Sequence, residues 1–144
     1  MDTLMPVLHV VAAVFLIGPL AILPMTGLRA IRGGQGEQVA TVSRSTFVTA
    51  LLSLLVVVFG FGALASSDPK YDLSISTPWI LWSLVSYAVA VALTLLLVVP
   101  AMRTAALSLA AGADPKPQYS RVAALSGIAT LLLVVAVVLM VWKP

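Results

Sequence analysis

Residues 123–142 read AALSGIATLLLVVAVVLMVW and contain no charged side chain. A helix of about 20 apolar residues spans the hydrocarbon core of a bilayer, so this stretch predicts a transmembrane helix. Three further stretches have the same character, at residues 6–28, 46–65 and 78–99, and every Lys, Arg, Asp and Glu lies outside the four stretches. The sequence therefore predicts an all-α membrane protein. We expect a single transmembrane domain over residues 1–144, built as an antiparallel bundle of four helices.

The composition leaves little material for a surface in water. The chain is 61% hydrophobic and 9% charged, whereas a soluble domain has about 25% charged residues. It has no cysteine and one histidine, which excludes disulfides, thiolate-bound metal clusters and bis-histidine haem within the chain. We therefore expect no cofactor and no catalytic role. The net charge of +3 comes from single basic residues beside the apolar stretches, which favours topology signals over a nucleic-acid partner.

The distribution of basic residues predicts the orientation in the membrane. Loops 29–45 and 100–122 carry six of them, namely Arg29, Arg32, Arg44, Arg103, Lys116 and Arg121. The opposite side carries only Lys70 and Lys143. The positive-inside rule then places loops 29–45 and 100–122 in the cytoplasm, and loop 66–77 and both termini outside the plasma (inner) membrane. The same six side chains are candidates for contact with anionic lipid headgroups, at about 1 kcal/mol each.

The first stretch predicts a kinked helix that stays in the protein. No Lys or Arg precedes it, and its apolar run is longer than that of a signal peptide. Gly18-Pro19 and Pro24 lie within it. Each proline lacks a backbone donor, which frees the carbonyls of Phe15 and Leu20. The kink either shapes the packing or presents these carbonyls to a polar ligand.

His9 is the one ionisable residue inside a predicted span. A histidine in lipid needs a hydrogen-bond partner, and the third span offers Ser83, Ser86 and Tyr87. The alternative is a metal site, because Met1, Met5 and His9 recur every four residues and share a helix face. Met140 is expected at the same depth on the fourth helix. Thioether sulfur and imidazole suit Cu(I), and a haem iron held by His9 and a methionine is a further variant.

Small and hydroxyl-bearing residues recur every four positions on the last three spans. Such stripes allow close helix contacts and hydrogen bonds between helices. They are formed by Thr49 and Ser53, by Ser86, Ala90 and Thr94, and by Ser126 and Thr130. The spans carry no acidic or basic side chain for ion transport, and a small-solute permease would need a polar path through the bundle.

Leu8-His9-Val10, the later Gly18-Pro19 and the four-span topology resemble a family of small bacterial, often actinobacterial, integral membrane proteins of unknown function. That family is distantly similar to the membrane domain of copper-resistance protein D. The actinobacterial cytochrome bcc–oxidase supercomplex contains small accessory membrane subunits of this kind. The resemblance thus implies a non-catalytic accessory subunit whose partners are membrane lipids and other membrane subunits of a respiratory complex.

We expect such a subunit to act through helix and lipid packing, with both chain ends held in place by the assembly. Two alternatives remain open at this stage. One is a copper- or haem-binding protein that uses His9 at the outer face, and the other is the small-solute permease.

Overall fold

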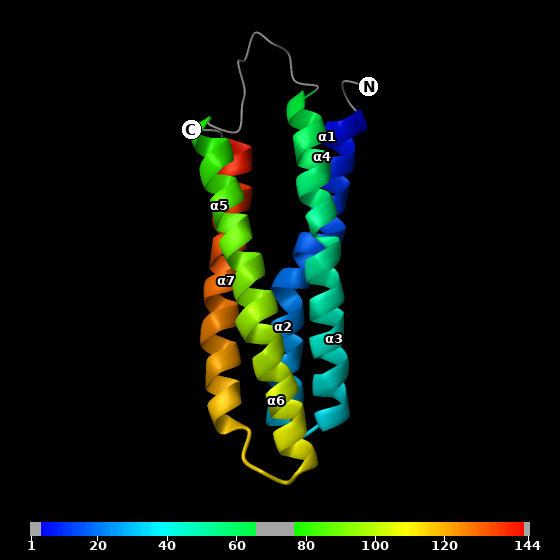
Figure 1. The fold of residues 1–144 in the computed structure, drawn as a ribbon, viewed down its shortest axis with the longest axis vertical. Coiled ribbons are helices and arrows are strands. Elements are labelled where there is room, and N and C mark those ends of the chain that lie inside the picture. The colour runs from blue at the N-terminus through cyan, green and yellow to red at the C-terminus, as the bar shows by residue number, and fades with distance from the viewer. Residues whose placement is uncertain (1–3, 66–76, 143–144) are drawn as a thin grey trace.

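The computed structural model describes residues 4–65 and 77–142. Every regular element in these two ranges is helical, and together they form four rods (Figure 1). Each rod is long and apolar enough to cross a membrane, and the four run over Leu4–Arg32, Gly36–Ala65, Pro78–Ala110 and Lys116–Trp142. The predicted all-α class with four membrane-spanning helices is confirmed. The expectation that the chain ends are held in place concerns residues outside the described ranges.

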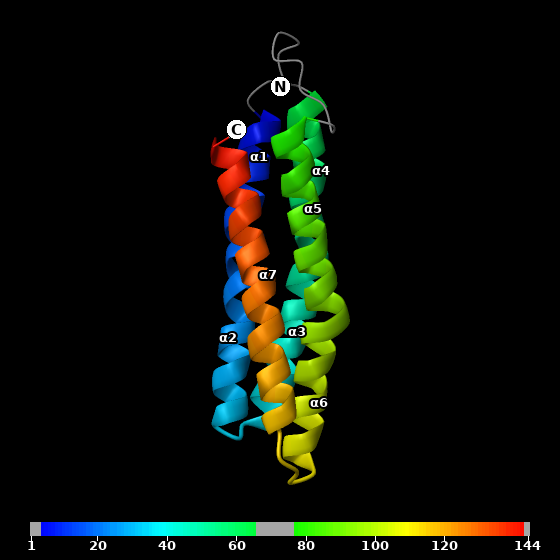
Figure 2. The ribbon, with the colours of Figure 1, turned by 90° about the vertical axis from the view of Figure 1, so that its left-hand side faces the viewer.

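Three of the four rods are interrupted. The first consists of α1 (Leu4–Ala12), η1 (Ala13–Ile17) and α2 (Gly18–Arg32). The second consists of α3 (Gly36–Leu52) and α4 (Leu54–Ala65), and the third of α5 (Pro78–Leu93), η3 (Thr94–Val98) and α6 (Val99–Ala110). The fourth rod is the unbroken α7 (Lys116–Trp142). Consecutive rods run in opposite directions along the long axis of the molecule (Figures 1 and 2).

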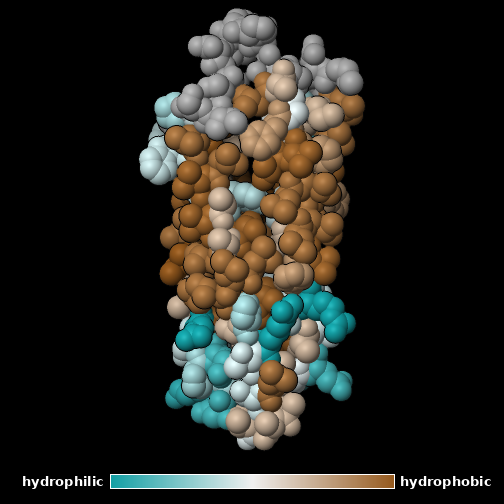
Figure 3. Space-filling model, viewed as in Figure 1, coloured by the Kyte–Doolittle hydropathy of each residue, from teal (hydrophilic) through white to brown (hydrophobic). Residues whose placement is uncertain are grey.

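The rods are longer than the predicted spans. They hold 27 to 33 residues, which at about 1.5 Å per residue exceeds the roughly 30 Å of a hydrocarbon core. The second rod already begins at Gly36, well before residue 46, and α6 continues the third past Pro100 to Ala110. The added turns are hydrophilic and lie beyond a broad apolar band (Figure 3). We call this end, which holds the turns around Gly34 and Gly112, the basic end.

The core of the bundle lies mainly toward the basic end. There α2, α3, α6 and α7 meet around Met102, Val39, Val98 and Val122, all of which are fully buried. A second cluster around Leu20, Ala90, Ala129 and Leu133 continues it toward the middle. In the opposite half, α1 packs chiefly on α4 and α5 chiefly on α7, so the bundle divides into two helix pairs (Figure 1).

Wide turns mark two of the prolines. The π-turn η1 directly precedes Gly18-Pro19, and the Gly18 N–H donates to the Ala13 carbonyl. In the same way η3 directly precedes Val99-Pro100, and the Val99 N–H donates to the Thr94 carbonyl. A proline ring clashes with the carbonyl of the preceding turn in an α-helix, and a widened turn relieves that clash. The predicted interruption at Gly18-Pro19 is therefore present, in the form of a π-turn.

Pro24 behaves differently, because it lies inside the continuous helix α2. Close to it, the Thr130 hydroxyl of α7 donates to the Ala21 carbonyl at 3.3 Å. The Ala21 carbonyl of the first rod thus accepts a hydrogen bond from a neighbouring helix. That the prolines free the carbonyls of Phe15 and Leu20 stays a prediction.

Candidate functional site

His9 lies on the face of α1 that contacts α4, and its Nδ1 is 2.8 Å from the carbonyl oxygen of Val56. A carbonyl oxygen can only accept, so Nδ1 carries the hydrogen and donates it. In the neutral ring Nε2 then keeps its lone pair. The partner of His9 is therefore a backbone group of the second rod, and the predicted hydroxyl partners on the third span are wrong.

Two glycines of α4 make room for this contact. A Cβ atom at Gly60 would lie 3.0 Å from His9 Cε1, and one at Gly62 would lie 2.7 Å from Met5 Sδ. Both distances are shorter than ordinary carbon contacts, so a side chain at either position would force His9 or Met5 to shift, and the two glycines favour the close approach of the helices. The shared face predicted for Met5 and His9 is thus filled by α4. These glycines were not among the predicted contact residues, although small residues such as those of Gly60-Phe61-Gly62 favour close helix packing.

Two of the hydroxyls that were expected near His9, those of Tyr87 and Ser83, make other contacts. The Ser53 hydroxyl, at the junction of α3 and α4, donates to the Ala50 carbonyl at 2.6 Å. It therefore accepts from the Tyr87 hydroxyl, which is also 2.6 Å away. Ser83 donates to the Trp79 carbonyl of its own helix at 2.6 Å. The Ser53–Tyr87 bond ties α5 to the break in the second rod, and it is one of the predicted bonds between helices.

The methionines considered as metal ligands do not gather into one group. Met5 and His9 lie together on α1 against α4. Met140 lies on α7, which packs on α5 and α2, whereas α1 belongs to the other helix pair (Figure 1). Met1 lies outside the described residues. Within residues 4–65 and 77–142 no three His, Asp or Glu side chains are close enough to share a metal ion.

All six basic residues considered for lipid contact are exposed and lie toward the basic end of the bundle: Arg29, Arg32, Arg44, Arg103, Lys116 and Arg121. Two of them stack on aromatic rings. The Arg32 guanidinium carbon lies 5.5 Å from the centre of the Tyr119 ring, and that of Arg103 lies 5.3 Å from the centre of the Phe47 ring. Such stacking holds the apolar part of an arginine on the protein and leaves its charge at the surface.

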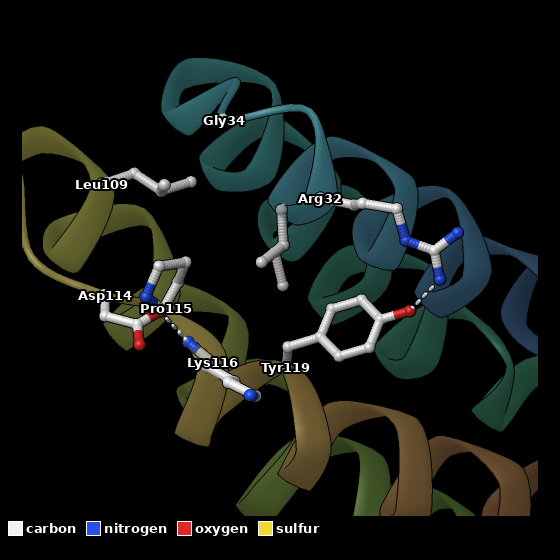
Figure 4. Close-up of a pocket in the computed structure, with 8 residues that line it drawn as sticks. Arg32, Gly34, Leu109, Asp114, Pro115, Lys116 and Tyr119 are labelled. Carbon is white, nitrogen blue, oxygen red and sulfur yellow. Dashed lines mark hydrogen bonds between the residues drawn. The ribbon is translucent and has the colours of Figure 1, made fainter.

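An open pocket of about 460 Å³ lies between the end of α2 and the start of α7 (Figure 4). Arg32 reaches across to donate a hydrogen bond to the Tyr119 hydroxyl. Asp114 accepts the backbone N–H of Lys116 at 3.0 Å, which caps the start of α7. Two cations and one carboxylate line the pocket, so its surface attracts anions weakly.

The orientation can be tested at the basic end. A reporter inserted at the exposed turn residue Gly34 is expected to lie in the cytoplasm, and one fused after Pro144 to lie outside. A phosphatase that is active only outside the cytoplasm and a fluorescent protein that folds only inside give opposite readouts at each position. The reverse pattern at both positions would overturn the proposed orientation.

The fold defines the class: four long apolar rods with a hydrophilic end make this chain a multi-pass membrane protein. Residues 3–144 match the family described as "Predicted integral membrane protein (DUF2269)", and the chain belongs to that family. Comparison with curated proteins found no match, and neither did comparison with solved structures. The prediction of an uncharacterised integral membrane family is confirmed, as is the multi-pass membrane location.

Proposed function

We propose that this chain is a non-catalytic accessory subunit of a larger membrane complex and acts through helix and lipid packing. One observation carries the proposal. In the half away from the basic end, α1 buries no residue and α4 buries only Val56. The outward side chains of α1, of the adjoining η1 and of α4 are large and apolar, and the most exposed are Val10, Val14, Phe15 and Val58. The helix pair α1/α4 is thus held to the bundle mainly at one end, and the outward faces of both helices are exposed to lipid or to another protein.

A helix pair of this kind suits a groove between the helices of another subunit. The faces of α1 and α4 carry valine, leucine and phenylalanine, which pack well on other apolar helices. The hydroxyls Ser53, Thr94 and Ser126 are used inside the bundle, where they bond to carbonyls of their own helices. The chemistry that remains on the surface is therefore packing against helices and lipid. We place the protein in the plasma (inner) membrane with its basic end in the cytoplasm.

The resemblance to small respiratory accessory subunits supports the cytochrome bcc–oxidase supercomplex as the first assembly to test. The α1/α4 pair would contact the partner subunits there. The six basic side chains would contact anionic headgroups at the basic end, at about 1 kcal/mol each.

The test is purification of the complex through a tag on this chain in a mild detergent. Oxidase subunits are expected to co-purify at a fixed stoichiometry. Val14→Trp, on the exposed face of η1 next to α1 (62% exposed), is expected to abolish the association, because a larger ring has no room in an interface. The matched control is Leu131→Trp on α7 (63% exposed), where lipid adapts to the ring. Recovery of a lone monomer, or equal effects of the two variants, would refute the proposal.

The geometry of His9 favours one second candidate. A metal-binding histidine commonly donates its other ring N–H to a carbonyl, as His9 Nδ1 does to Val56. Nε2 would then be the ligand atom for copper or a haem iron. Metal analysis and visible spectra of the same purified material decide between the candidates. Stoichiometric copper or haem that is lost in His9→Ala would replace packing as the function.

A further inference from the structure

A groove of about 190 Å³ lies between α6 and α7, where the apolar band meets the basic end. Its apolar part is formed by Leu96 and Leu97 of η3, which are 70% and 42% exposed. Its polar part is formed by Thr104, Gln118 and Arg121. One groove thus joins a surface suited to acyl chains with a surface suited to a headgroup.

The groove holds hydrogen-bond acceptors that lack a donor. Gln118 Oε1 is buried and has no hydrogen-bond partner among the described residues. The Thr104 hydroxyl donates to the Pro100 carbonyl at 3.0 Å, so its oxygen can only accept a hydrogen bond from a ligand. Gln118 Oε1 is the buried one of the two, and a buried acceptor without a donor is unfavourable because it has lost its bond to water. The Thr104 oxygen is exposed. A ligand that donates to Thr104, and to Gln118 after a small rotation of that side chain, would therefore be stabilised.

The charge of the groove indicates which lipid headgroups fit it. Among the described residues that line the groove, Arg121 is the one that carries a charge, and none is a carboxylate. A guanidinium pairs with a phosphate through two parallel hydrogen bonds. An ammonium headgroup would bring a second positive charge close to Arg121, with one phosphate shared between two cations, whereas neutral hydroxyls supply donors without that repulsion.

We propose that this groove binds one anionic phospholipid with a glycerol headgroup. Its phosphate pairs with Arg121, its headgroup hydroxyls donate to Gln118 and Thr104, and its chains lie along Leu96 and Leu97. The site belongs to this chain alone, so it stands independently of the proposed subunit role. It also differs from diffuse attraction to the six basic residues, because the hydroxyl donors are part of the recognition.

The experiment is native mass spectrometry of the full chain in detergent with phosphatidylglycerol, phosphatidic acid or phosphatidylethanolamine. The first phosphatidylglycerol is expected to bind about tenfold more tightly than phosphatidylethanolamine. Arg121→Gln is expected to weaken phosphatidylglycerol and phosphatidic acid alike, by about tenfold. The matched control is Arg44→Gln, an exposed basic residue of this end on α3 that does not line the groove. Arg44 would contact lipid of the surrounding bilayer, whereas the first lipid bound in detergent occupies the groove, so this variant is expected to change either affinity by less than about twofold.

Gln118→Met tests the hydroxyl recognition. It is expected to weaken phosphatidylglycerol severalfold and to leave phosphatidic acid, which lacks the headgroup hydroxyls, unchanged. The variant is also expected to unfold at an unchanged or higher temperature without lipid, since an unpartnered acceptor has been removed. That measurement separates a lost site from a lost fold.

Three results would overturn the proposal. Equal effects of Arg121→Gln and Arg44→Gln would show diffuse electrostatic attraction instead of a site. Equal effects of Gln118→Met on phosphatidylglycerol and phosphatidic acid would remove the headgroup recognition. Binding of glycerol 3-phosphate as tightly as the lipid would show an anion site without a role for the chains.

Discussion

Met102→Ala is expected to lower the free energy of unfolding of the chain in detergent by about 2–5 kcal/mol. Met102 is fully buried where all four rods meet, near the basic end. Truncating its side chain removes contacts and leaves a cavity that the close-packed helices cannot refill. The measurement is a reversible denaturant titration in which the circular dichroism signal of the helices reports the folded fraction.

A matched control uses another methionine of the same bundle. Met25 lies on α2 and is 60% exposed on the apolar surface. Met25→Ala is expected to change the free energy of unfolding by no more than about 0.5 kcal/mol. Comparable losses for the two variants would contradict the assignment of the core to this end of the bundle.

A substitution at the neighbouring Gly27 is expected to recover part of the stability that Met102→Ala loses. A Cβ atom at Gly27 would lie 2.8 Å from Met102 Sδ, so Gly27→Ala alone crowds the side chain of Met102. In Met102→Ala that crowding is gone, and the added methyl group occupies part of the cavity. Gly27→Ala is therefore expected to destabilise the native protein and to recover some stability in Met102→Ala. This opposite sign is a sharper test of the contact than either single variant.

The number of helices could be predicted from the sequence because it depends only on where charges are absent. Which face of each helix is buried could not be predicted from the sequence. In a soluble helix the apolar residues mark the buried side, but lipid accepts the same residues as a core does. Leu20 is 2% exposed and Ile22 is 60% exposed, although both are branched aliphatic residues of one helix. Apolar periodicity therefore says little about packing in this chain.

Polar residues were more informative about the interior. Among the residues of the predicted small and hydroxyl stripes, Ser53, Ser86, Thr94 and Ser126 are buried, as expected for groups that avoid lipid. The partner of His9 could not be predicted in this way, because it is a backbone carbonyl and every residue has one. The π-turns could not be predicted from the sequence either. Proline indicates where a helix is interrupted, but the form of the interruption depends on the helices packed around it.

Gly60→Leu is expected to separate α1 from α4 and to destabilise this helix pair. A leucine side chain at Gly60 would occupy the position of the His9 ring, since even its Cβ atom would lie 3.0 Å from Cε1. Overpacking of this kind costs about 1–3 kcal/mol. Loss of the bond from His9 to the Val56 carbonyl leaves a donor without a partner, which adds about 1–3 kcal/mol.

The chain contains no cysteine, so an engineered pair can report on this contact alone. Met5 Cβ lies 3.6 Å from the Cβ position of Gly62, within the range of about 3.5–4.5 Å found in disulfides. Met5→Cys with Gly62→Cys is therefore expected to form a disulfide between α1 and α4 under mild oxidation. Adding Gly60→Leu is expected to abolish most of the cross-link, as measured by mass spectrometry after proteolysis between the two rods.

The matched control is Gly127→Leu on α7, where an added side chain meets open space and the cross-link is expected to persist. His9→Ala is expected to restore cross-linking in Gly60→Leu, because it removes the ring that the leucine displaces. The same variants then connect the packing to the proposed function. If the α1/α4 pair contacts partner subunits, Gly60→Leu reduces co-purification and Gly127→Leu does not. A cross-link that survives Gly60→Leu unchanged would show that His9 and the glycines do not set the distance between these helices.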